Sequence, residues 1–130
     1  MKYIVLAGRI LYSLIFLNSG IFHFTDMSVD YSSSQGVPMA SVLVPLSGLM
    51  AIVGGLSIAL GFKAKLGAWI LVAFLIPVTF MMHAFWNLSD PAQQQMQMAM
   101  FMKNISILGS ALLITWFGAG PVSFDARKNK

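Results

Sequence analysis

Residues 67–86, GAWILVAFLIPVTFMMHAFW, decide the fold of this chain, because no charged side chain interrupts their twenty positions. A helix of about 20 mostly apolar residues is long enough to cross the hydrocarbon core of a bilayer. The rest of the chain has the same character. Its 130 residues are 58% apolar and only 9% charged, whereas a soluble domain is about 25% charged. The sequence therefore predicts an integral membrane protein.

Three further stretches are comparably long and apolar. In lipid only helices and closed barrels satisfy the backbone polar groups, and these runs are too long and too uniformly apolar for barrel strands. We therefore expect an all-α fold, a bundle of four transmembrane helices, with residues 1–130 forming a single domain. The four predicted spans are residues 4–24, 43–62, 67–86 and 99–118.

The charged residues predict how the bundle lies in the membrane. Lysine and arginine gather at the two chain ends and in the short turn at 63–66, whereas the loops at 25–42 and 87–98 contain aspartate and neither lysine nor arginine. The positive-inside rule then places both termini in the cytoplasm, in the inner membrane of a cell. The basic residues that carry this prediction are Lys2, Lys63, Lys65, Arg127, Lys128 and Lys130, and the acidic residues of the two loops are Asp26, Asp30 and Asp90.

Composition also excludes several functions. The chain has no cysteine, so it contains no disulfide, thiolate metal ligand, iron–sulfur cluster or thiol redox centre. Its net charge of +4 is explained by topology and does not indicate nucleic-acid binding. The lipid bilayer is the expected partner.

Small residues indicate how the helices pack. Close approach of backbones drives helix association in lipid, and Ser47, Ala51, Gly55 and Ala59 recur at every fourth position. We interpret this stripe as a packing face; the alternative is a backbone-lined ligand groove. Gly109 is expected to serve packing in the fourth span. Pro77 should kink the third span, and such kinks often accompany cavities.

Arg9 is the charged residue that most needs explaining within the first span. It could extend its side chain to the cytoplasmic surface. Alternatively it faces the bundle, because Ser13, Gly20 and His23 follow it at helical spacing. An inward Arg9 needs a carboxylate or carbonyl partner, and Asp125 in the C-terminal tail is the nearest acid on that side of the membrane.

Both histidines are predicted to lie at matched depth near the outer face, where the first and third spans end. Single histidines at an interface usually bond to backbone or water. A quinone headgroup is the next alternative, and haem or a metal is the one we favour least, because a single metal ion needs more than two ligands. The candidate ligand-binding cluster is His23, His83, Trp86, Lys103 and Asn104.

The chain resembles the DoxX family of small four-helix membrane proteins over nearly its whole length. Individually the shared motifs are weak, but they occur in the family's order. They are the opening helix with Arg9, Gly20 and His23, the loop SSSQGVPMAS, the turn GGLSIALGFKAKLGAW, the His83-x-x-Trp86 and Lys103-Asn104 pairs, and the closing FGAGPVSFD with Asp125.

The chain departs from that family at Ala51, where many members carry a glutamate in the second span. A role that depends on this carboxylate is therefore in doubt. The resemblance implies a link with quinol oxidase or with other redox complexes of the membrane. It implies a fold and a location more firmly than a reaction.

Three functions follow from these observations. The favoured one is a non-catalytic accessory or binding protein of inner-membrane redox complexes, holding quinone or lipid near the outer face, alone or as a homo-oligomer. The second is a quinone-linked oxidoreductase subunit, and the third a small transporter. Because no titratable relay crosses the spans, we expect no catalysis from the isolated chain.

Overall fold

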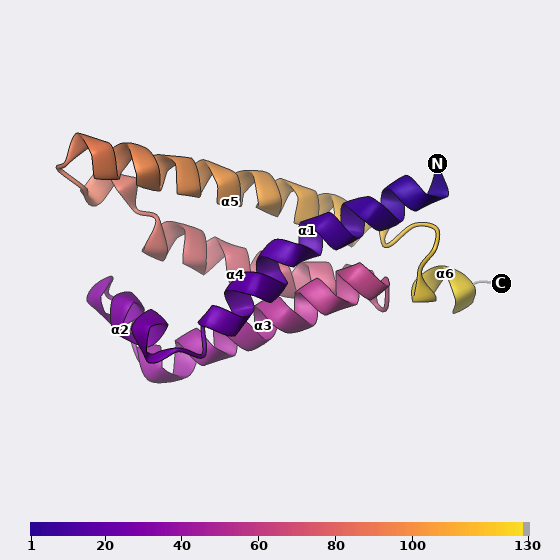
Figure 1. The fold of residues 1–130 in the computed structure, drawn as a ribbon, viewed down its shortest axis with the longest axis horizontal. Coiled ribbons are helices and arrows are strands. Elements are labelled where there is room, and N and C mark those ends of the chain that lie inside the picture. Colours follow the sequence, from indigo (N-terminus) through magenta and orange to yellow (C-terminus); the bar gives the residue numbers. More distant parts are fainter. Residues whose placement is uncertain (129–130) are drawn as a thin grey trace.

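The computed structural model describes residues 1–128, and four long helices dominate it (Figure 1). Each is long and apolar enough to cross a membrane. The predicted all-α bundle of four transmembrane helices is therefore confirmed. The helices are α1 (Lys2–Phe22), α3 (Ala40–Leu60), α4 (Ala64–Met82) and α5 (Pro91–Phe117).

Three short helices join or follow the long ones: α2 (Asp26–Ser34), η1 (Phe85–Asn87) and α6 (Phe124–Lys128). The first of these lies where the sequence predicted a loop. The Thr25 hydroxyl oxygen accepts a hydrogen bond from the backbone N–H of Ser28 (3.3 Å) and so caps α2.

The boundaries of the third and fourth spans differ from those predicted. Helix α4 ends at Met82 and is followed by η1, and α5 begins at Pro91, eight residues before the predicted start. The Asp90 carboxylate accepts from the N–H of Gln93 (3.3 Å), and proline suits the first helical position. At 27 residues, α5 is about 40 Å long, longer than the hydrocarbon core of about 30 Å.

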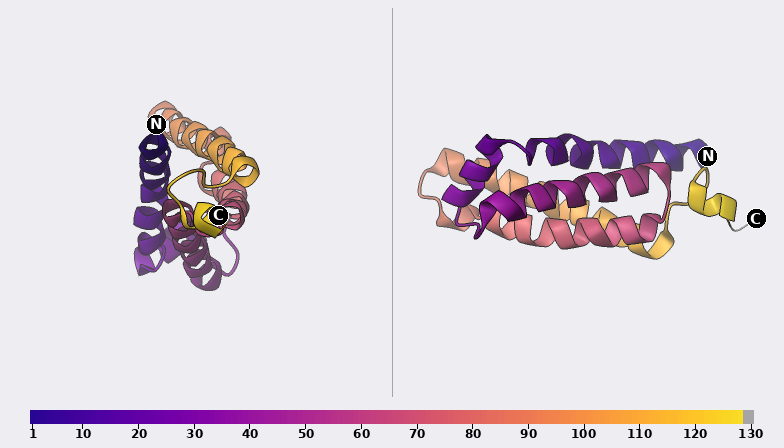
Figure 2. Two further views of the ribbon diagram at one scale, coloured as in Figure 1. Left: turned by 90° about the vertical axis from the view of Figure 1, so that its right-hand side faces the viewer. Right: turned by 90° about the horizontal axis from the view of Figure 1, so that it is seen from below.

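The long helices pack in chain order: α1 against α3, α3 against α4, and α4 against α5. Helices α1 and α5 are joined by a hydrogen bond from the Tyr12 hydroxyl, halfway along α1, to the carbonyl oxygen of Ile107 (3.2 Å). The N-terminus and α6 lie at the same end of the bundle (Figure 1). We name it the terminal end, and we name the opposite end, which holds His23, α2 and His83, the histidine end. Two views at right angles show both the bundle and its two ends (Figure 2).

Glycines allow the closest helix crossings. At Gly20 and Gly48 the backbones of α1 and α3 meet, because an added Cβ at Gly48 would lie 2.7 Å from the carbonyl oxygen of Gly20. The α3–α4 crossing is equally close, since a Cβ at Gly54 would lie 2.6 Å from a Leu71 methyl carbon. The core between these crossings consists of Phe16, Ala51, Ile58, Ala68, Leu71, Phe74 and Leu75.

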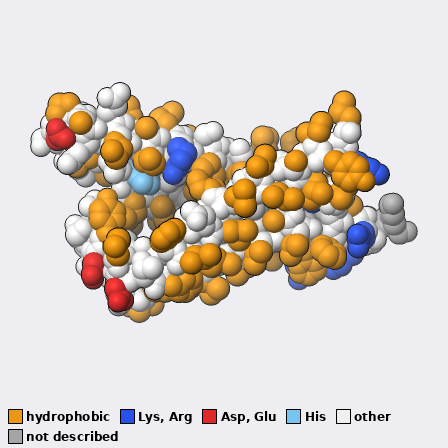
Figure 3. Space-filling view, viewed as in Figure 1, with side chains coloured by type: hydrophobic (Ala, Val, Ile, Leu, Met, Phe, Trp, Pro, Cys, Tyr) orange, Lys and Arg blue, Asp and Glu red, His pale blue; other side chains and the backbone are white. Residues whose placement is uncertain are grey.

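Charges separate along the length of the bundle. Three of the four acidic residues, Asp26, Asp30 and Asp90, belong to α2 and the start of α5 at the histidine end, and the fourth, Asp125, lies in α6 at the terminal end. Most of the basic side chains lie at the terminal end (Figure 3). The basic residue Lys130, used in the topology argument, lies outside the described residues.

Candidate functional site

A cavity of about 410 Å³ opens at the histidine end. It is lined by the end of α1, by α2, by the first half of α3 and by the second half of α4. In the space-filling view the molecule is hollowed at this end, between the start of α5 on one side and α2 with the start of α3 on the other (Figure 3). The volume is within the range of about 300–1,000 Å³ that small-ligand sites occupy.

Most of the cavity wall is apolar, and a few polar groups are spread along it. Hydroxyl groups from α2 face imidazole and hydroxyl groups from α1, α3 and the end of α4. The apolar lining is Val37, Leu43, Val44, Leu46, Met50, Ala73, Phe74, Pro77, Val78, Met81 and Met82; the polar lining is His23, Ser28, Tyr31, Ser32, Ser47 and His83.

The hydrogen bonds of His23 fix which ring nitrogen carries its proton. Nδ1 lies 2.8 Å from the Ser47 hydroxyl oxygen. That hydroxyl donates its own proton to the carbonyl oxygen of Val44 (2.6 Å). Nδ1 must therefore donate to Ser47, and the neutral ring keeps Nε2 as a hydrogen-bond acceptor.

The same reasoning applies to His83. Its Nδ1 lies 2.8 Å from the side-chain oxygen of Gln97 on α5. An amide oxygen can only accept, so Nδ1 donates and Nε2 again has a free lone pair. Both histidines thus present acceptors. On α2 the Tyr31 and Ser32 hydroxyls can donate, whereas the Ser28 hydroxyl already donates to the carbonyl oxygen of Phe22 (2.7 Å).

The lining of the cavity is mostly apolar, with a few hydrogen-bonding groups. None of its lining residues is acidic, and residues 1–128 contain no group of three or more histidine, cysteine, aspartate or glutamate side chains placed to hold a metal ion. An apolar wall with distributed hydrogen-bonding groups holds and orients a ligand.

Only part of the predicted ligand cluster meets in this cavity. His23 and His83 both line it, whereas Trp86, Lys103 and Asn104 do not. Asn104 is buried within the bundle, at 6% exposure. Trp86 belongs to an aromatic group with Phe80, Phe85 and Phe101. Lys103 is exposed, and its Nζ lies 3.7 Å from the Met100 sulfur.

Sequence reasoning missed the contribution of α2 to the cavity. Ser28, Tyr31 and Ser32 lie on that helix and line one wall. The signal that would have revealed the helix is Thr25 followed by Asp26, a capping residue with an acid in the first turn. Pro77, which was expected to accompany a cavity, lines the opposite wall.

At the terminal end, Arg9 is held by backbone carbonyl groups. One Nη donates to Ala119 (2.6 Å) and, at longer range, to Pro121 (3.4 Å), and the other donates to Val122 (2.6 Å). Only 5% of the Arg9 side chain is exposed. Arg9 therefore does not extend to the membrane surface but lies inside the bundle, under the C-terminal tail. Ser13, one turn further along α1, is fully buried.

The expected contact between Arg9 and Asp125 is not among the hydrogen bonds or ion pairs of the described residues. The Asp125 carboxylate instead accepts from the backbone N–H groups of Lys63 (2.8 Å) and Ala64 (2.9 Å). These are orphan donors at the start of α4. In return, the N–H of Asp125 donates to the Gly61 carbonyl oxygen (2.8 Å). The tail therefore joins α1 to the α3–α4 turn.

The predicted packing stripe of α3 divides between the core and the cavity. Ala51 and Gly55 are buried, and Gly55 packs against Phe16 and Leu17 of α1. Ser47 serves the cavity through His23, and Ala59 is half-buried. Gly109 has no neighbour within 4 Å of an added Cβ, so it does not pack within this bundle.

Fold and site together define a class: a multi-pass, all-helical membrane protein with an apolar cavity at one end. The chain belongs to the SURF4 family, which it matches over residues 1–130.

Its relatives fall into two groups. It is 32% identical to the inner membrane protein YqjF of Escherichia coli, covering 97% of this chain and 92% of that one. It is 30% identical to a Surfeit locus protein 4 homolog of Drosophila melanogaster and 26% identical to the ER-derived vesicles protein ERV29 of Saccharomyces cerevisiae. This chain spans only 42% and 34% of the length of those two eukaryotic relatives. No solved structure matches it significantly.

These findings correct two expectations. The chain is a SURF4-family protein, so its assignment to the DoxX family is wrong. The function in redox complexes, with its quinone-linked alternatives, depended on that assignment and is also wrong. The physical reason lies in the motifs used. Arg9 and the closing segment with Asp125 tie the tail to the bundle, a structural task that specifies no redox chemistry.

Proposed function

We propose that this chain is a non-catalytic membrane receptor that binds an apolar segment of a partner polypeptide in the histidine-end cavity. The observation that carries the proposal is the cavity itself, about 410 Å³ with a largely apolar wall. It opens to the surface of the molecule in the hollow between the start of α5 and α2 (Figure 3).

The distribution of polar groups favours a peptide over an acyl chain. Hydroxyl donors on α2 and the Nε2 acceptors of His23 and His83 line different walls. A peptide repeats its N–H and C=O groups at every residue and can use such distributed partners. An acyl chain carries polar atoms only at its headgroup and would leave most of them unpaired, at a cost for each.

Family membership supports a receptor role. One relative is named for ER-derived vesicles, and others are named as inner membrane proteins. The bacterial relatives share nearly the full length of this chain, so a role common to the family would reside in the four-helix unit itself.

The location we propose is the inner membrane, with both termini in the cytoplasm. The basic terminal end supports this orientation through the positive-inside rule. Because the chain lacks cysteine, single cysteines test it cleanly. An impermeant maleimide added outside intact cells should label Ser34→Cys on α2 and leave Lys65→Cys unlabelled until the membrane is opened. The reverse pattern would overturn the orientation.

Photo-crosslinking tests the receptor role. A benzophenone amino acid replaces Val78, which lines the cavity, or Leu113, which is 61% exposed on α5. We expect the probe at position 78 to form discrete adducts containing peptides of a second protein, and the probe at 113 to form lipid adducts. Lipid adducts alone at position 78 would assign the cavity to lipid and reject the peptide receptor.

A further inference from the structure

A second cavity, of about 730 Å³, opens at the terminal end of the bundle. Residues from the α3–α4 turn and the start of α4, from the segment 117–120 after α5, and from α6 line it. A short turn between two membrane-spanning helices lies where the hydrocarbon core meets water. The cavity is therefore at the level of the lipid headgroups.

The lining of this cavity is basic. Lys63, Lys65 and Lys128 line it, and all three are exposed. Asp125 is the single acidic residue of the lining. Its carboxylate accepts from the backbone N–H groups of Lys63 and Ala64, and no ion pair within residues 1–128 joins it to one of the three lysines. Three lysines against one aspartate leave the lining with two positive charges in excess.

The lysine side chains reach the cavity from different elements of the chain. A Cβ added at Gly118 would lie 3.3 Å from the Lys65 Cε, so Lys65 extends from α4 to the segment after α5. The Nζ atoms of Lys63 and Lys128 lie over the same ring, that of Phe62, at 5.9 and 4.9 Å from its centre. Because a lysine has a flexible four-carbon stem, the three ammonium groups can turn toward one ligand in the cavity.

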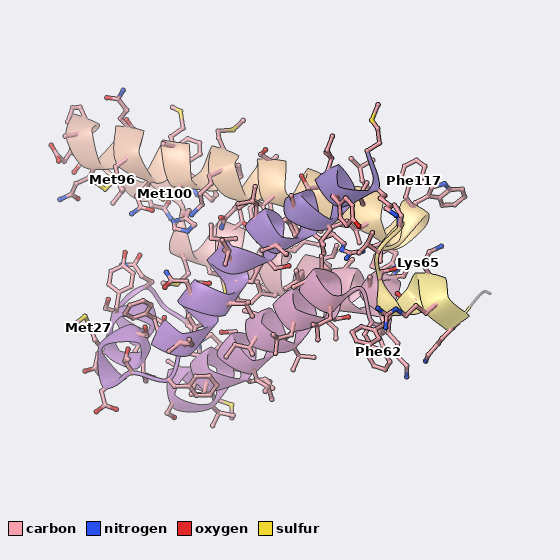
Figure 4. The ribbon with its side chains drawn as sticks, turned by 45° about the vertical axis from the view of Figure 1, so that its right-hand side comes forward. Met27, Phe62, Lys65, Met96, Met100 and Phe117 are labelled. Carbon is pink, nitrogen blue, oxygen red and sulfur yellow. The ribbon has the colours of Figure 1, made fainter. Side chains whose placement is uncertain are left out.

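The same lining also has an apolar part. Leu66 and Phe117 both line the cavity, and they are 57% and 75% exposed. In the stick view the labelled Lys65 lies between Phe117, at the end of α5, and Phe62, beside α6 (Figure 4). A small inorganic anion would use only the lysines. A phospholipid presents a phosphate and acyl chains side by side and would use both parts of the lining.

We propose that this cavity binds the headgroup of an anionic phospholipid. Its phosphate lies at the lysines, and the upper methylene groups of its acyl chains lie against Leu66 and Phe117. Lysine binds phosphate as a point charge, and basic pockets among membrane helices recognise anionic lipids. The excess of two positive charges favours a headgroup with two phosphates over one with a single phosphate. A zwitterionic headgroup carries its own ammonium group and should bind most weakly.

The test uses the full chain in detergent, titrated with cardiolipin, phosphatidylglycerol or phosphatidylcholine, and native mass spectrometry counts the bound lipid. We expect affinity to fall in that order. Each lysine near a phosphate contributes a similar increment, so Lys65→Gln should weaken cardiolipin binding about fivefold. Replacing Lys63, Lys65 and Lys128 together with glutamine should weaken it about 100-fold. Lys65→Arg keeps the charge and should keep the affinity.

The matched control is Lys2→Gln. It removes one positive charge from the same end of the bundle, but Lys2 does not line the cavity, and its Nζ lies over the Tyr3 ring at 5.3 Å from the centre. It should leave cardiolipin affinity unchanged. Equal losses in Lys2→Gln and Lys65→Gln would mean that the basic end attracts anionic lipid without a site, and would overturn the proposal. Equal affinity for phosphatidylcholine would overturn it as well.

Inorganic phosphate distinguishes a lipid from a free anion. Because the apolar contacts belong to the lipid, inorganic phosphate at the concentration of the lipid should leave bound cardiolipin in place. Displacement would assign the cavity to a free anion and reject the lipid. Cardiolipin should also raise the unfolding temperature of the unchanged chain more than that of the triple glutamine variant, and equal increases would contradict the site. This cavity lies at the opposite end from the receptor cavity, so the two proposals fail or succeed separately.

Discussion

The two ends of the bundle use their polar side chains in opposite ways. At the terminal end both Nη groups of Arg9 donate to backbone carbonyl groups of the tail, and the Asp125 carboxylate accepts from backbone N–H groups, whereas the buried Nε of Arg9 has no partner. At the histidine end, His23 and His83 each have one ring nitrogen tied to the protein, and both line an open cavity. Polar groups that hydrogen-bond to the protein's own backbone contribute to stability. A polar group on a cavity wall with an unused donor or acceptor is available to a ligand.

The difference teaches that charge alone is a poor guide to function in this chain. Arg9, the most conspicuous intramembrane charge, holds the tail. The neutral hydroxyl and imidazole groups at the other end form the candidate site. Substitutions of Arg9 and Asp125 should therefore change stability, and substitutions at the histidine end should change binding.

The largest effect is expected at Arg9. Replacement by methionine keeps much of the volume but leaves the carbonyl groups of Ala119 and Val122 without their donors. Hydrogen bonds from a charged group contribute about 1.5–3 kcal/mol each, so the free energy of unfolding in detergent should fall by about 3 kcal/mol or more. Arg9→Lys, which keeps the charge and loses the second branch, should recover part of it. A loss below about 1 kcal/mol would show that the tail is not held by Arg9.

A smaller loss is expected at the crossing of α1 and α3, next to His23. The Cβ of Gly48→Ala would lie 2.6 Å from the His23 Cβ and 2.7 Å from the Gly20 carbonyl oxygen. Forcing α1 and α3 apart should cost about 2 kcal/mol of unfolding free energy. The matched control is Gly109→Ala, whose Cβ meets nothing within 4 Å and which should be neutral or stabilising by up to about 1 kcal/mol. Similar effects at the two sites would contradict the assigned packing.

Substitution of Asp125 should lower the free energy of unfolding by a moderate amount. Asp125→Ala leaves the N–H groups of Lys63 and Ala64 without their shared acceptor, which should lower the free energy of unfolding by about 1–2 kcal/mol. Asp125→Asn keeps one oxygen acceptor and should lose roughly half as much. Hydrogen exchange at the start of α4 should accelerate in the alanine variant. Unchanged exchange there would mean that the carboxylate does not cap α4.

The smallest effect on stability is expected at the histidine end. His83→Gln removes one hydrogen bond of a half-buried ring and should change the free energy of unfolding by less than about 1 kcal/mol. The yield of polypeptide adducts from the probe at position 78 should nevertheless fall in this variant. A large stability loss with unchanged binding would reverse the comparison of the two ends.

The sequence was sufficient to predict the four spans, because a lipid solvent constrains every residue that faces it. Two local signals bear on the boundaries that differ: Thr25 before Asp26 at the start of α2, which went unused, and Asp90-Pro91, which indicated a turn and an early start of the fourth helix. Both are capping patterns that local chemistry explains. The sequence therefore contained the signals for the early start of α5 and for the additional helix α2.

The partners of Arg9 and of the histidines could not be predicted in the same way. Arg9 and Val122 are 113 positions apart, and only the packed tail brings them together. Likewise, helix packing places His23 and His83 in the wall of one cavity, whereas Trp86 and Asn104, predicted at a similar depth, do not line it. The assignment to the DoxX family failed because residues of its motifs, such as Arg9 and Asp125, hold the tail against the helices and do not identify a family.

The most direct test of the receptor account fills the cavity. Ala73 is exposed and lines the cavity, so Ala73→Phe should occupy it without disturbing the core. Ala99→Phe, at an exposed alanine on α5 outside the cavity, is the matched control. The measurement is the yield of polypeptide adducts from the probe at position 78. The account predicts that Ala73→Phe abolishes these adducts while Ala99→Phe preserves them. Equal yields in the two variants would contradict it.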